Sequence, residues 1–594
     1  MSRPVWLKPP PFAGRVLAEI GLGVPRGVKG RGVLPDRAGL AAVALTLGAA
    51  VVLAIGTAGM FAPLAGMKPI SLDPASLPVY GVRTVLRMLA GMAASLVFTL
   101  IYGTMAAKSR RAEVVLIPLL DILQSVPVLG YLSFTVTFFI LLFPDRVLGA
   151  ELASIFAIFT SQAWNMAFSF FQALRTVPRD LDEASRAFKF SSWQRFWRVE
   201  FPFAVPGLIW NMMMSMSGGW FFVVASEAIT AGDKQIALPG IGSYVAQAIQ
   251  QRDLGAIGWA ILAMTVAIII YDQLLFRPLV VWSDKFRAEQ TAALTAPHSW
   301  YLQLLQHSRV MRLAAHPLRF CAHHLLRARP LNLMPARSLL TVQTRAERML
   351  DLAWYVAVCV GAVWVASFIV RYVATGVGWD DVGMTLRLGS FTLLRVAILV
   401  VLASLVWVPI GVMIGLRPRI AEIIQPLAQF LAAFPANLLF PFVVIPIVKL
   451  GLNADIWLTP LMILGTQWYI LFNVIAGTTA YPTDFLEAAK NFRFHGWQWW
   501  RIAILPGIFP FFVTGAITAS GGAWNASIVA EVASWGDDHL TAHGLGAYIA
   551  QMTTANDYPR IVLGIAVMSG FVVLFNRLLW RPLYAYSERR FRLD

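Results

Sequence analysis

The chain has 594 residues, of which 58% are hydrophobic and only 13% charged, and its mean hydropathy is +0.66. Ordinary soluble domains carry about 25% charged residues, so this composition excludes a water-soluble fold, a disordered chain and a disulfide scaffold. The 48 Lys and Arg residues exceed the 31 Asp and Glu residues by 17. In a membrane protein this excess indicates basic loops on the cytoplasmic side rather than nucleic-acid binding.

An α-helix needs about 20 apolar residues to cross a bilayer, and the first part of the chain contains six such stretches. They lie at 40–61, 86–107, 114–143, 148–174, 203–227 and 256–276. The third stretch is too long for one simple crossing and contains Pro118 and Pro127. Because proline interrupts a helix, we expect a broken or re-entrant path there.

Six further apolar stretches follow in the same order. They lie at 352–374, 391–416, 420–448, 456–477, 509–531 and 561–580. We therefore predict an all-α integral membrane protein with about twelve transmembrane helices. Lys and Arg gather in every second loop, which predicts that these loops and both termini face the cytoplasm.

The second part of the chain repeats the first at an offset of 304 residues, which slips to 308 upstream of the fourth span. The matched pairs include Arg277 and Arg581, Glu183 and Glu487, Trp193 and Trp497, Trp220 and Trp524, Glu227 and Glu531, and Pro118 and Pro426. Two homologous halves have therefore been fused. Each half has an even number of spans, so the repeats are parallel and a pseudo-twofold axis runs along the membrane normal.

Four regions follow from this pattern. Residues 1–39 are predicted to form a basic cytoplasmic arm, 40–283 the first half, 284–350 a basic cytoplasmic linker, and 351–594 the second half. The linker contains the pair His323-His324, but it lacks Cys or carboxylate partners at ligand spacing, and Cys321 and Cys359 lack metal-site spacing. We predict no metal site, and a linker whose basic residues meet anionic lipid headgroups.

A long polar loop follows the fourth span of each half, at 177–207 and 481–510. Each loop begins with a proline and acidic residues, which suit the first turn of a helix, and continues with basic and aromatic residues. This pattern predicts a short amphipathic helix that lies beside the membrane. An ordinary basic loop anchored at the headgroups is the alternative.

These loops resemble the Glu-Ala-Ala loop of permease subunits in binding-protein-dependent ATP-binding-cassette importers, and the resemblance implies the type I importer permease fold. The motif appears as Glu183-Ala184-Ser185, Trp193 and Phe201-Pro202, and again as Glu487-Ala488-Ala489, Trp497 and Leu505-Pro506. In that family the loop forms a coupling helix that sits in a cleft of the ATPase subunit. The resemblance implies coupling positions at Glu183, Ala184, Lys189, Trp193, Glu487, Ala488, Arg493 and Trp497. Lys189 and Arg493 replace the glycine of the family motif, which leaves the geometry of the turn open.

A second resemblance concerns the segment after the fifth span. A tryptophan, an acidic residue and a Gly-x-Gly recur in that order, at Trp220, Glu227 and 240–242, and at Trp524, Glu531 and 544–546. This order is similar to the nitrate, sulfonate and taurine permease group. It implies two ATPase subunits and a periplasmic or lipid-anchored solute-binding protein as partners, with ATP and Mg²⁺ held by the ATPases. It also implies that the chain crosses the inner membrane of a bacterial cell many times.

The chain has no phosphate-binding loop and no nucleophile paired with a base, so we expect a transport component and not an enzyme. The predicted function is the permease of an ATP-driven importer for a small anion such as nitrate, a sulfonate, taurine or bicarbonate. A fused permease for ferric iron or an osmolyte, or a secondary transporter driven by an ion gradient, is the alternative.

Polar and aromatic residues inside the spans are candidates for the pathway, because such residues are costly in a bilayer. The candidates are Gln162, Asn165, Trp220, Glu227, Gln467, Trp524, Asn525 and Glu531. For the two glutamates, helix capping or ion pairing is the alternative to contact with the solute. For the tryptophans, the alternative is packing or a place in the interfacial aromatic belt.

Overall fold

The computed structural model describes most of the chain between residues 69 and 590. The described residues are 48, 54, 56–57, 61–63, 69–126, 128–144, 146–231, 234–286, 299–307, 345–479, 481 and 483–590. The predicted arm at 1–39 lies outside them, as do nearly all of the predicted first span at 40–61 and most of the predicted linker.

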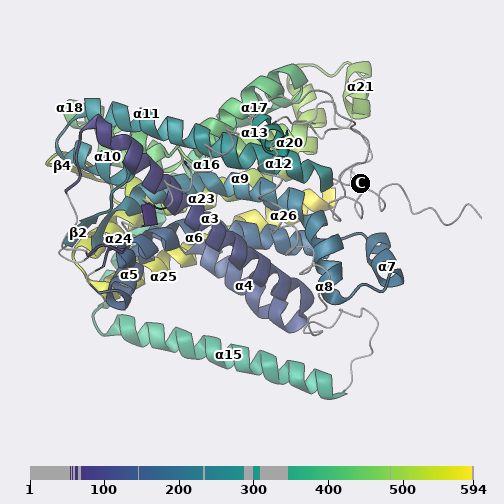
Figure 1. Cartoon of the computed structure of the whole chain (residues 1–594), viewed down its shortest axis with the longest axis horizontal. Coiled ribbons are helices and arrows are strands. Elements are labelled where there is room, and N and C mark those ends of the chain that lie inside the picture. Colours follow the sequence, from purple (N-terminus) through teal and green to yellow (C-terminus); the bar gives the residue numbers. More distant parts are fainter. Residues whose placement is uncertain are drawn as a thin grey trace, which may run out of the picture.

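Helices and one short antiparallel hairpin build the first half (Figure 1). In chain order the elements are η3 (Pro74–Ser76), α3 (Leu77–Lys108), α4 (Arg110–Ser125), α5 (Val128–Leu142), α6 (Val147–Arg175), α7 (Arg179–Ala187), α8 (Ser192–Arg195), η4 (Phe196–Glu200), α9 (Phe201–Glu227), β1 (Ala228–Ala231), β2 (Lys234–Ala237), α10 (Ile241–Gln250), α11 (Leu254–Tyr271), η5 (Asp272–Phe276), α12 (Arg277–Ser283) and η6 (Asp284–Phe286). The short helix α13 (Trp300–His307) lies in the predicted linker.

The second half follows the same plan. Its elements are α15 (Arg345–Ala374), α16 (Trp379–Gly415), α17 (Pro418–Ala433), η7 (Ala436–Leu439), α18 (Phe440–Leu450), α19 (Ala454–Trp457), η8 (Thr459–Met462), α20 (Trp468–Thr479), α21 (Thr483–Asn491), α22 (Gly496–Gln498), η9 (Trp499–Ile504), α23 (Leu505–Ala530), β3 (Val532–Trp535), β4 (Asp538–Thr541), α24 (Leu545–Thr554), α25 (Tyr558–Phe575), η10 (Asn576–Trp580) and α26 (Arg581–Arg590).

The repeat read from the sequence recurs in the elements. Both hairpins, both helices that follow them and the coupling-loop helices recur at the offset of 304 residues. The caps recur as well: the side chain of Asp253 accepts from the Ala256 amide at the start of α11, and that of Asp557 accepts from the Arg560 amide at the start of α25. Each cap satisfies a backbone donor that the first helical turn leaves unpaired. The prediction of two fused halves is confirmed.

The spans are interrupted near prolines and glycines, in both halves for the third span and in one half for the fourth. The predicted third span is indeed interrupted, because α4 ends at Ser125 and α5 begins at Val128. Its counterpart bends by 81° between 419–433 and 436–450. The fourth span is one continuous helix in the first half, α6, but is divided into α19, η8 and α20 in the second, where Pro460 and Gly465 lie in or beside the interruption.

Within the described residues, eight helices are long and apolar enough to cross a membrane, and the bent pair α17–α18 makes a ninth candidate. The all-α membrane fold is therefore as predicted, whereas the number of twelve spans stays a prediction. The division of the chain at residues 40, 284 and 351 also stays a prediction.

The two halves pack against each other through contacts between related regions. The Val128 amide donates to Asn525 Oδ1 at 2.9 Å, and Asn437 Nδ2 donates to the Phe221 carbonyl at 3.3 Å. Phe221 and Asn525 are equivalent positions, whereas Val128 is the first and Asn437 the second residue after the equivalent prolines. The same regions of both halves therefore meet near the pseudo-twofold axis, although the donor and acceptor groups of the two hydrogen bonds differ.

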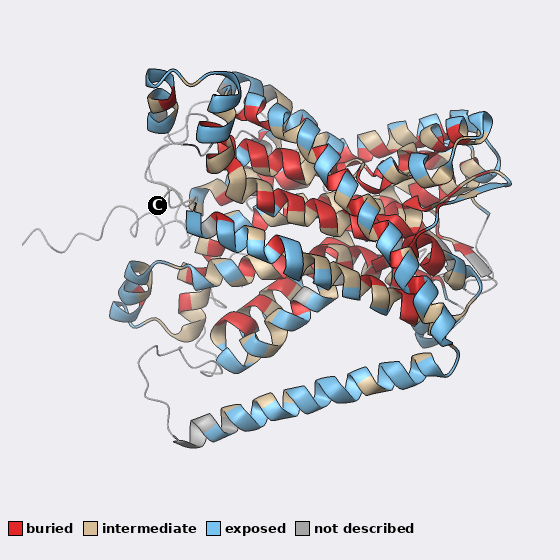
Figure 2. Ribbon diagram, turned by 180° about the vertical axis from the view of Figure 1, so that it is seen from behind, coloured by how far each residue is buried: buried red, intermediate tan, exposed pale blue. Residues whose placement is uncertain are grey.

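Helix α15 lies at the margin of the molecule and is exposed along nearly its whole length (Figures 1 and 2). It belongs to the second half in sequence, yet its start contacts α4 of the first half. Arg111 Nε lies 2.6 Å from Asp351 Oδ1, and Trp354 Nε1 donates to the Arg111 carbonyl at 3.2 Å. The exposed surface of α15 is apolar, as expected for a helix that faces lipid tails.

Candidate functional site

A central cavity of about 130 Å³ lies between the halves, where α4, α5, α6 and α9 meet the region from η7 to α20 and α23. Several of its lining residues come in pairs at the repeat offset. The pairs are Ser161 and Gly465, Asn165 and Tyr469, Ser217 and Gly521, Gly218 and Gly522, Phe221 and Asn525, and Phe222 and Ala526. The cavity therefore lies on the pseudo-twofold axis, yet the two members of each pair differ in chemistry or size, except for the glycines.

No charged side chain lines the central cavity among the residues that the structure describes. Its polar groups are hydroxyls, amides and an indole. Gln124 Nε2 donates to Asn165 Oδ1 at 2.9 Å, and the Tyr469 hydroxyl donates to the Met214 carbonyl at 3.3 Å. The Trp164 Nε1 and Thr466 Oγ1 atoms are buried without a hydrogen-bond partner. A buried polar atom without a partner is costly, so either group would gain from a hydrogen bond to a water or solute that reached it.

A wider cavity of about 750 Å³ continues from the central one. The lining residues common to both are Gln124, Asn165, Tyr469, Ile517, Thr518 and Gly521. We call this wider cavity the vestibule. It is lined further by Asn211, Asn473 and Trp524, and it reaches Arg581 on α26. Helix α26 precedes the C-terminal end of the chain, on the side of the molecule that carries α7 and α21 (Figure 1). Together the two cavities form a path that is narrow at the centre and wide toward that side.

The predicted pathway residues divide between the cavities and the packed core. Asn165 and Asn525 line the central cavity, and Asn165 and Trp524 line the vestibule. Gln162 is fully buried against Met88, Trp220 packs on Tyr271, and Gln467 accepts from Trp407 Nε1 at 2.9 Å. These last three line neither cavity.

The predicted residue Glu227 lies outside both cavities, in a buried ion cluster of the first half. Arg87 Nε lies 2.5 Å from Glu151 Oε2, and Arg87 Nη1 lies 2.7 Å from Glu227 Oε1. All three side chains are at most 3% exposed. Glu227 also accepts from the Thr84 hydroxyl at 2.7 Å and from the Gly242 amide at 2.6 Å. The carboxylate therefore joins α3, the end of α9 and the start of α10, so it has the capping and pairing contacts considered in the sequence analysis.

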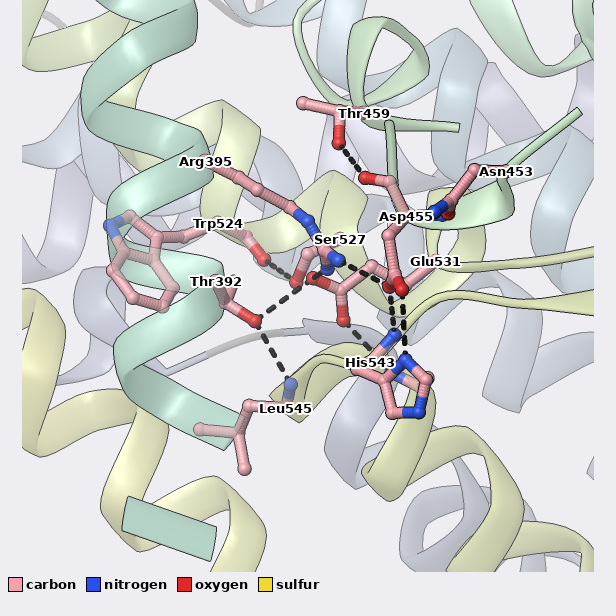
Figure 3. A network of polar contacts seen from close by, with 11 residues as sticks. Thr392, Arg395, Asn453, Asp455, Thr459, Trp524, Ser527, Glu531, His543 and Leu545 are labelled. Carbon is pink, nitrogen blue, oxygen red and sulfur yellow. Dashed lines mark hydrogen bonds and ion pairs between the residues drawn. The ribbon is translucent and has the colours of Figure 1, made fainter. Parts of the chain in front are cut away.

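The second half repeats this cluster around Glu531 (Figure 3). Arg395 lies 2.7 Å from Asp455 Oδ1 and 3.2 Å from Glu531 Oε1, and Glu531 accepts from the Thr392 hydroxyl and the Ala547 amide. One difference is His543, which replaces Pro239 and whose Nδ1 lies 2.9 Å from Asp455 Oδ2. The second cluster is more open, because the Asp455 side chain is 36% exposed.

Neither arginine, and only part of the central cavity, was predicted from the sequence. Arg87 lies inside the predicted second span, and Arg395 lies at the matching position in the second half. A search for charged residues that occupy matching positions inside the spans would have found them. A charge inside a span needs a partner, so each arginine also indicates a buried carboxylate nearby. Tyr469 and Thr466 gave no comparable signal, because polar residues of these types are common at helix interfaces.

The predicted coupling loops form two similar helix–turn–helix structures that lie at the same side of the molecule (Figure 1). Glu183 and Ala184 lie on α7 and are exposed, and Trp193 lies on α8. Glu487 and Ala488 lie on α21, with Glu487 exposed, and Trp497 lies on α22 with 71% of its surface exposed. In each loop the buried position is the third of the motif, Ser185 or Ala489.

Lys189 and Arg493, at the position of the family glycine, adopt a left-handed backbone with φ of 54°. The Lys189 amide donates to the Arg186 carbonyl at 2.9 Å, and the Phe190 amide donates to the Ser185 carbonyl at 3.1 Å. The second loop has the same two bonds. This is the helix-ending Schellman arrangement that usually employs glycine. The question that the sequence left open is thereby answered: the turn is kept, with a basic residue in a conformation that favours glycine.

The described residues contain no group of three or more His, Cys, Asp or Glu side chains placed to hold a metal ion. Cys359 is exposed on α15. Cys321 and the His323-His324 pair lie outside the described residues.

Comparison with protein families gives two matches to one model, described as the binding-protein-dependent transport system inner membrane component. The matched residues are 99–276 and 407–593, which is one match in each half and more than half of the chain. No solved structure matches.

The curated relatives are permease proteins, and each match covers about a third of this chain. The bicarbonate transport system permease protein CmpB of Synechocystis is 27% identical over 177 residues, which are 30% of this chain and 60% of the relative. The nitrate import permease protein NrtB of Synechocystis is 24% identical over 187 residues, 32% of this chain and 63% of the relative. The glycine betaine/carnitine transport permease protein GbuB of Listeria monocytogenes is 29% identical over 197 residues, 32% of this chain and 63% of the relative.

Proposed function

Because the chain belongs to the family of inner membrane components of binding-protein-dependent transport systems, we propose that it is the complete permease of an ATP-driven importer. The observation that carries this proposal is the central cavity on the pseudo-twofold axis between two family-type halves. One fused chain then supplies both halves of the pathway, and two cytoplasmic ATPase subunits supply the energy with ATP and Mg²⁺. A periplasmic or lipid-anchored protein delivers the solute.

Exposed residues at the predicted coupling positions support contact with the ATPase subunits. Glu183 and Glu487 are exposed at equivalent places on α7 and α21, which lie on the same side of the molecule. The basic loops of the sequence lie in the same region, so we assign this side and both termini to the cytoplasm. In this assignment the wide vestibule opens to the cytoplasm, and the described conformation faces inward.

The solute class that we propose is a small anion such as nitrate, bicarbonate or a sulfonate. The uncharged lining of the central cavity supports weak, transient binding of an anion by N–H and O–H donors. A fixed cationic side chain would instead hold the anion tightly and slow its release. Two similar relatives carry the names of bicarbonate and nitrate permeases.

A quaternary ammonium compound such as a betaine is the second candidate. The central cavity contains the aromatic residues Trp164, Phe221, Phe434 and Tyr469, and the faces of such rings attract quaternary ammonium groups. A betaine permease is also among the similar proteins.

Uptake by cells with and without the chain separates these candidates. Cells that express the chain with its ATPase and binding protein would be given labelled nitrate, bicarbonate, taurine and glycine betaine in turn, with and without depletion of ATP. ATP-dependent uptake of an anion supports the proposal, and uptake of glycine betaine alone selects the second candidate. Uptake that follows an ion gradient after ATP depletion would contradict both.

A further inference from the structure

The joint between the first coupling loop and the membrane helices is a partly buried ion network. Glu200, at the end of η4, pairs through one carboxylate oxygen with Lys108 at the end of α3 and with Arg195 Nε on α8, the latter at 3.1 Å. Arg195 Nη1 in turn lies 3.0 Å from Asp182 Oδ1 on α7. The side chains of Lys108, Arg195 and Glu200 are at most 15% exposed, whereas that of Asp182 is 34% exposed. This network links α7 to both α3 and the start of α9.

The second half has an apolar residue at each of the four equivalent positions. Leu416, Leu486, Trp499 and Ile504 replace Lys108, Asp182, Arg195 and Glu200 respectively. Ile504 is fully buried in the main hydrophobic core, and the other three pack against that core. The two joints therefore have the same arrangement of backbone elements, but charged side chains connect the first and apolar side chains connect the second.

We propose that Lys108, Asp182, Arg195 and Glu200 are positioning residues that make α7 move as one unit with α3 and α9, and that the second loop lacks this rigid connection. The inference rests on the proposed coupling of these loops to an ATPase. Charged hydrogen bonds are directional and fix both distance and orientation, whereas apolar contacts are non-directional and fix orientation less strictly. The first loop then transmits movement rigidly, and the second loop adjusts to its partner.

The same physics predicts how the network responds to substitution. Removal of one partner leaves the remaining charges buried without compensation, which is strongly unfavourable, whereas replacement of a whole buried ion network by apolar residues is often neutral. Glu200→Gln is the sharpest single change, because Glu200 Oε1 accepts from both Lys108 and Arg195. The fourfold variant with Lys108→Leu, Asp182→Leu, Arg195→Trp and Glu200→Ile gives the first joint the composition of the second.

Hydrogen exchange on the purified chain tests the mechanical part without any partner. Glu200→Gln is expected to raise amide exchange in residues 179–195 at least tenfold and to leave residues 483–499 unchanged. Asp182→Asn, at the more exposed end of the network, is expected to raise exchange in the same residues while the protein stays folded. Ile504→Val, at the position equivalent to Glu200, is the matched control in the second half. Unchanged exchange in 179–195 for both first-half variants would overturn the proposal.

The ratio of solute transported to ATP hydrolysed tests the transmission part, in liposomes that contain the chain with its ATPase subunits and binding protein. Glu200→Gln is expected to lower this ratio at least fivefold while ATP hydrolysis continues. The variant with all four substitutions is expected to recover protection from exchange in residues 179–195, together with part of the transport ratio. A parallel fall of uptake and hydrolysis would instead mean that the network only maintains the fold. If the wild-type complex shows no ATP-dependent uptake, the proposed function fails, and the exchange result still decides whether the network positions α7.

Discussion

Lys189 and Arg493, which are separated by 304 residues, hold the same left-handed backbone with φ of 54°. Each ends the helix that carries a Glu-Ala motif, and each is followed by a phenylalanine whose amide closes the turn. A left-handed conformation costs a residue other than glycine about 1–3 kcal/mol. The positive charge near the C-terminal end of the helix offsets part of this cost, because it interacts favourably with the unpaired carbonyl groups.

The first prediction concerns this strain. Lys189→Gly should stabilise the turn locally by up to about 1 kcal/mol, because the relief of strain exceeds the loss of charge and the added entropy of the unfolded chain. Lys189→Ala is the control, because it removes the charge and keeps the strain, so the turn should become less stable. Hydrogen exchange at the Phe190 amide, which donates to the Ser185 carbonyl, measures both effects. Equal exchange rates in the two variants would contradict the explanation.

The sequence was sufficient for the repeat and for most of the spans, because hydropathy and residue spacing are local properties. For example, the predicted span 203–227 corresponds to α9 (Phe201–Glu227). It was insufficient for the ion cluster around Arg87, whose partners lie 64 and 140 residues away and meet only when α3, α6 and α9 pack together. The counterpart of α6 in the second half is divided into α19, η8 and α20. This division was not predicted, because an apolar stretch with one proline still has the pattern of a single span.

The second prediction compares the two buried arginines. Arg87→Leu would leave Glu151 and Glu227 buried together without their counter-ion, and breaking a buried pair in this way costs about 3–5 kcal/mol. Arg395→Leu should cost less, because the Asp455 side chain is 36% exposed and has His543 as a further partner.

Thermal unfolding of both variants in the same detergent measures this difference. The melting temperature should fall clearly further for Arg87→Leu than for Arg395→Leu. An equal fall would mean that exposure at Asp455 does not relieve the second cluster.

The third prediction concerns acid stability. Burial acts to raise the pKa of the Asp455 carboxyl, but hydrogen bonds from the amide and imidazole of His543, with nearby Arg395, hold this pKa below its usual value. The unfolded chain has a pKa of about 3.9 at an aspartate. A carboxyl with a lowered folded-state pKa therefore stabilises the fold fully above about pH 4 and loses this effect as the pH falls through the folded-state pKa.

Asp455→Asn tests this sign. The melting temperature of the wild type should exceed that of Asp455→Asn at pH 6, and the difference should shrink as the pH is lowered toward 3. His543→Ala should reduce the difference at pH 6, because it removes the imidazole from the carboxylate. A difference that stays constant from pH 6 to pH 3 would show that the ionised carboxylate contributes nothing.

The fourth prediction compares Trp164 and Trp220, whose indoles belong to the first half. Trp164 Nε1 and Trp220 Nε1 are both buried without a hydrogen-bond partner, but only Trp164 lines the central cavity. If the Trp164 indole N–H donates to the solute in passage, Trp164→Phe removes this hydrogen bond. A single hydrogen bond contributes about 0.5–1.5 kcal/mol, so initial uptake at low solute concentration should fall about two- to tenfold. Trp220→Phe is the matched control, because it makes the same chemical change against Tyr271 and away from the cavity. Uptake that falls equally in both variants, after correction for the amount of protein in the membrane, would indicate a packing effect and remove Trp164 from the pathway.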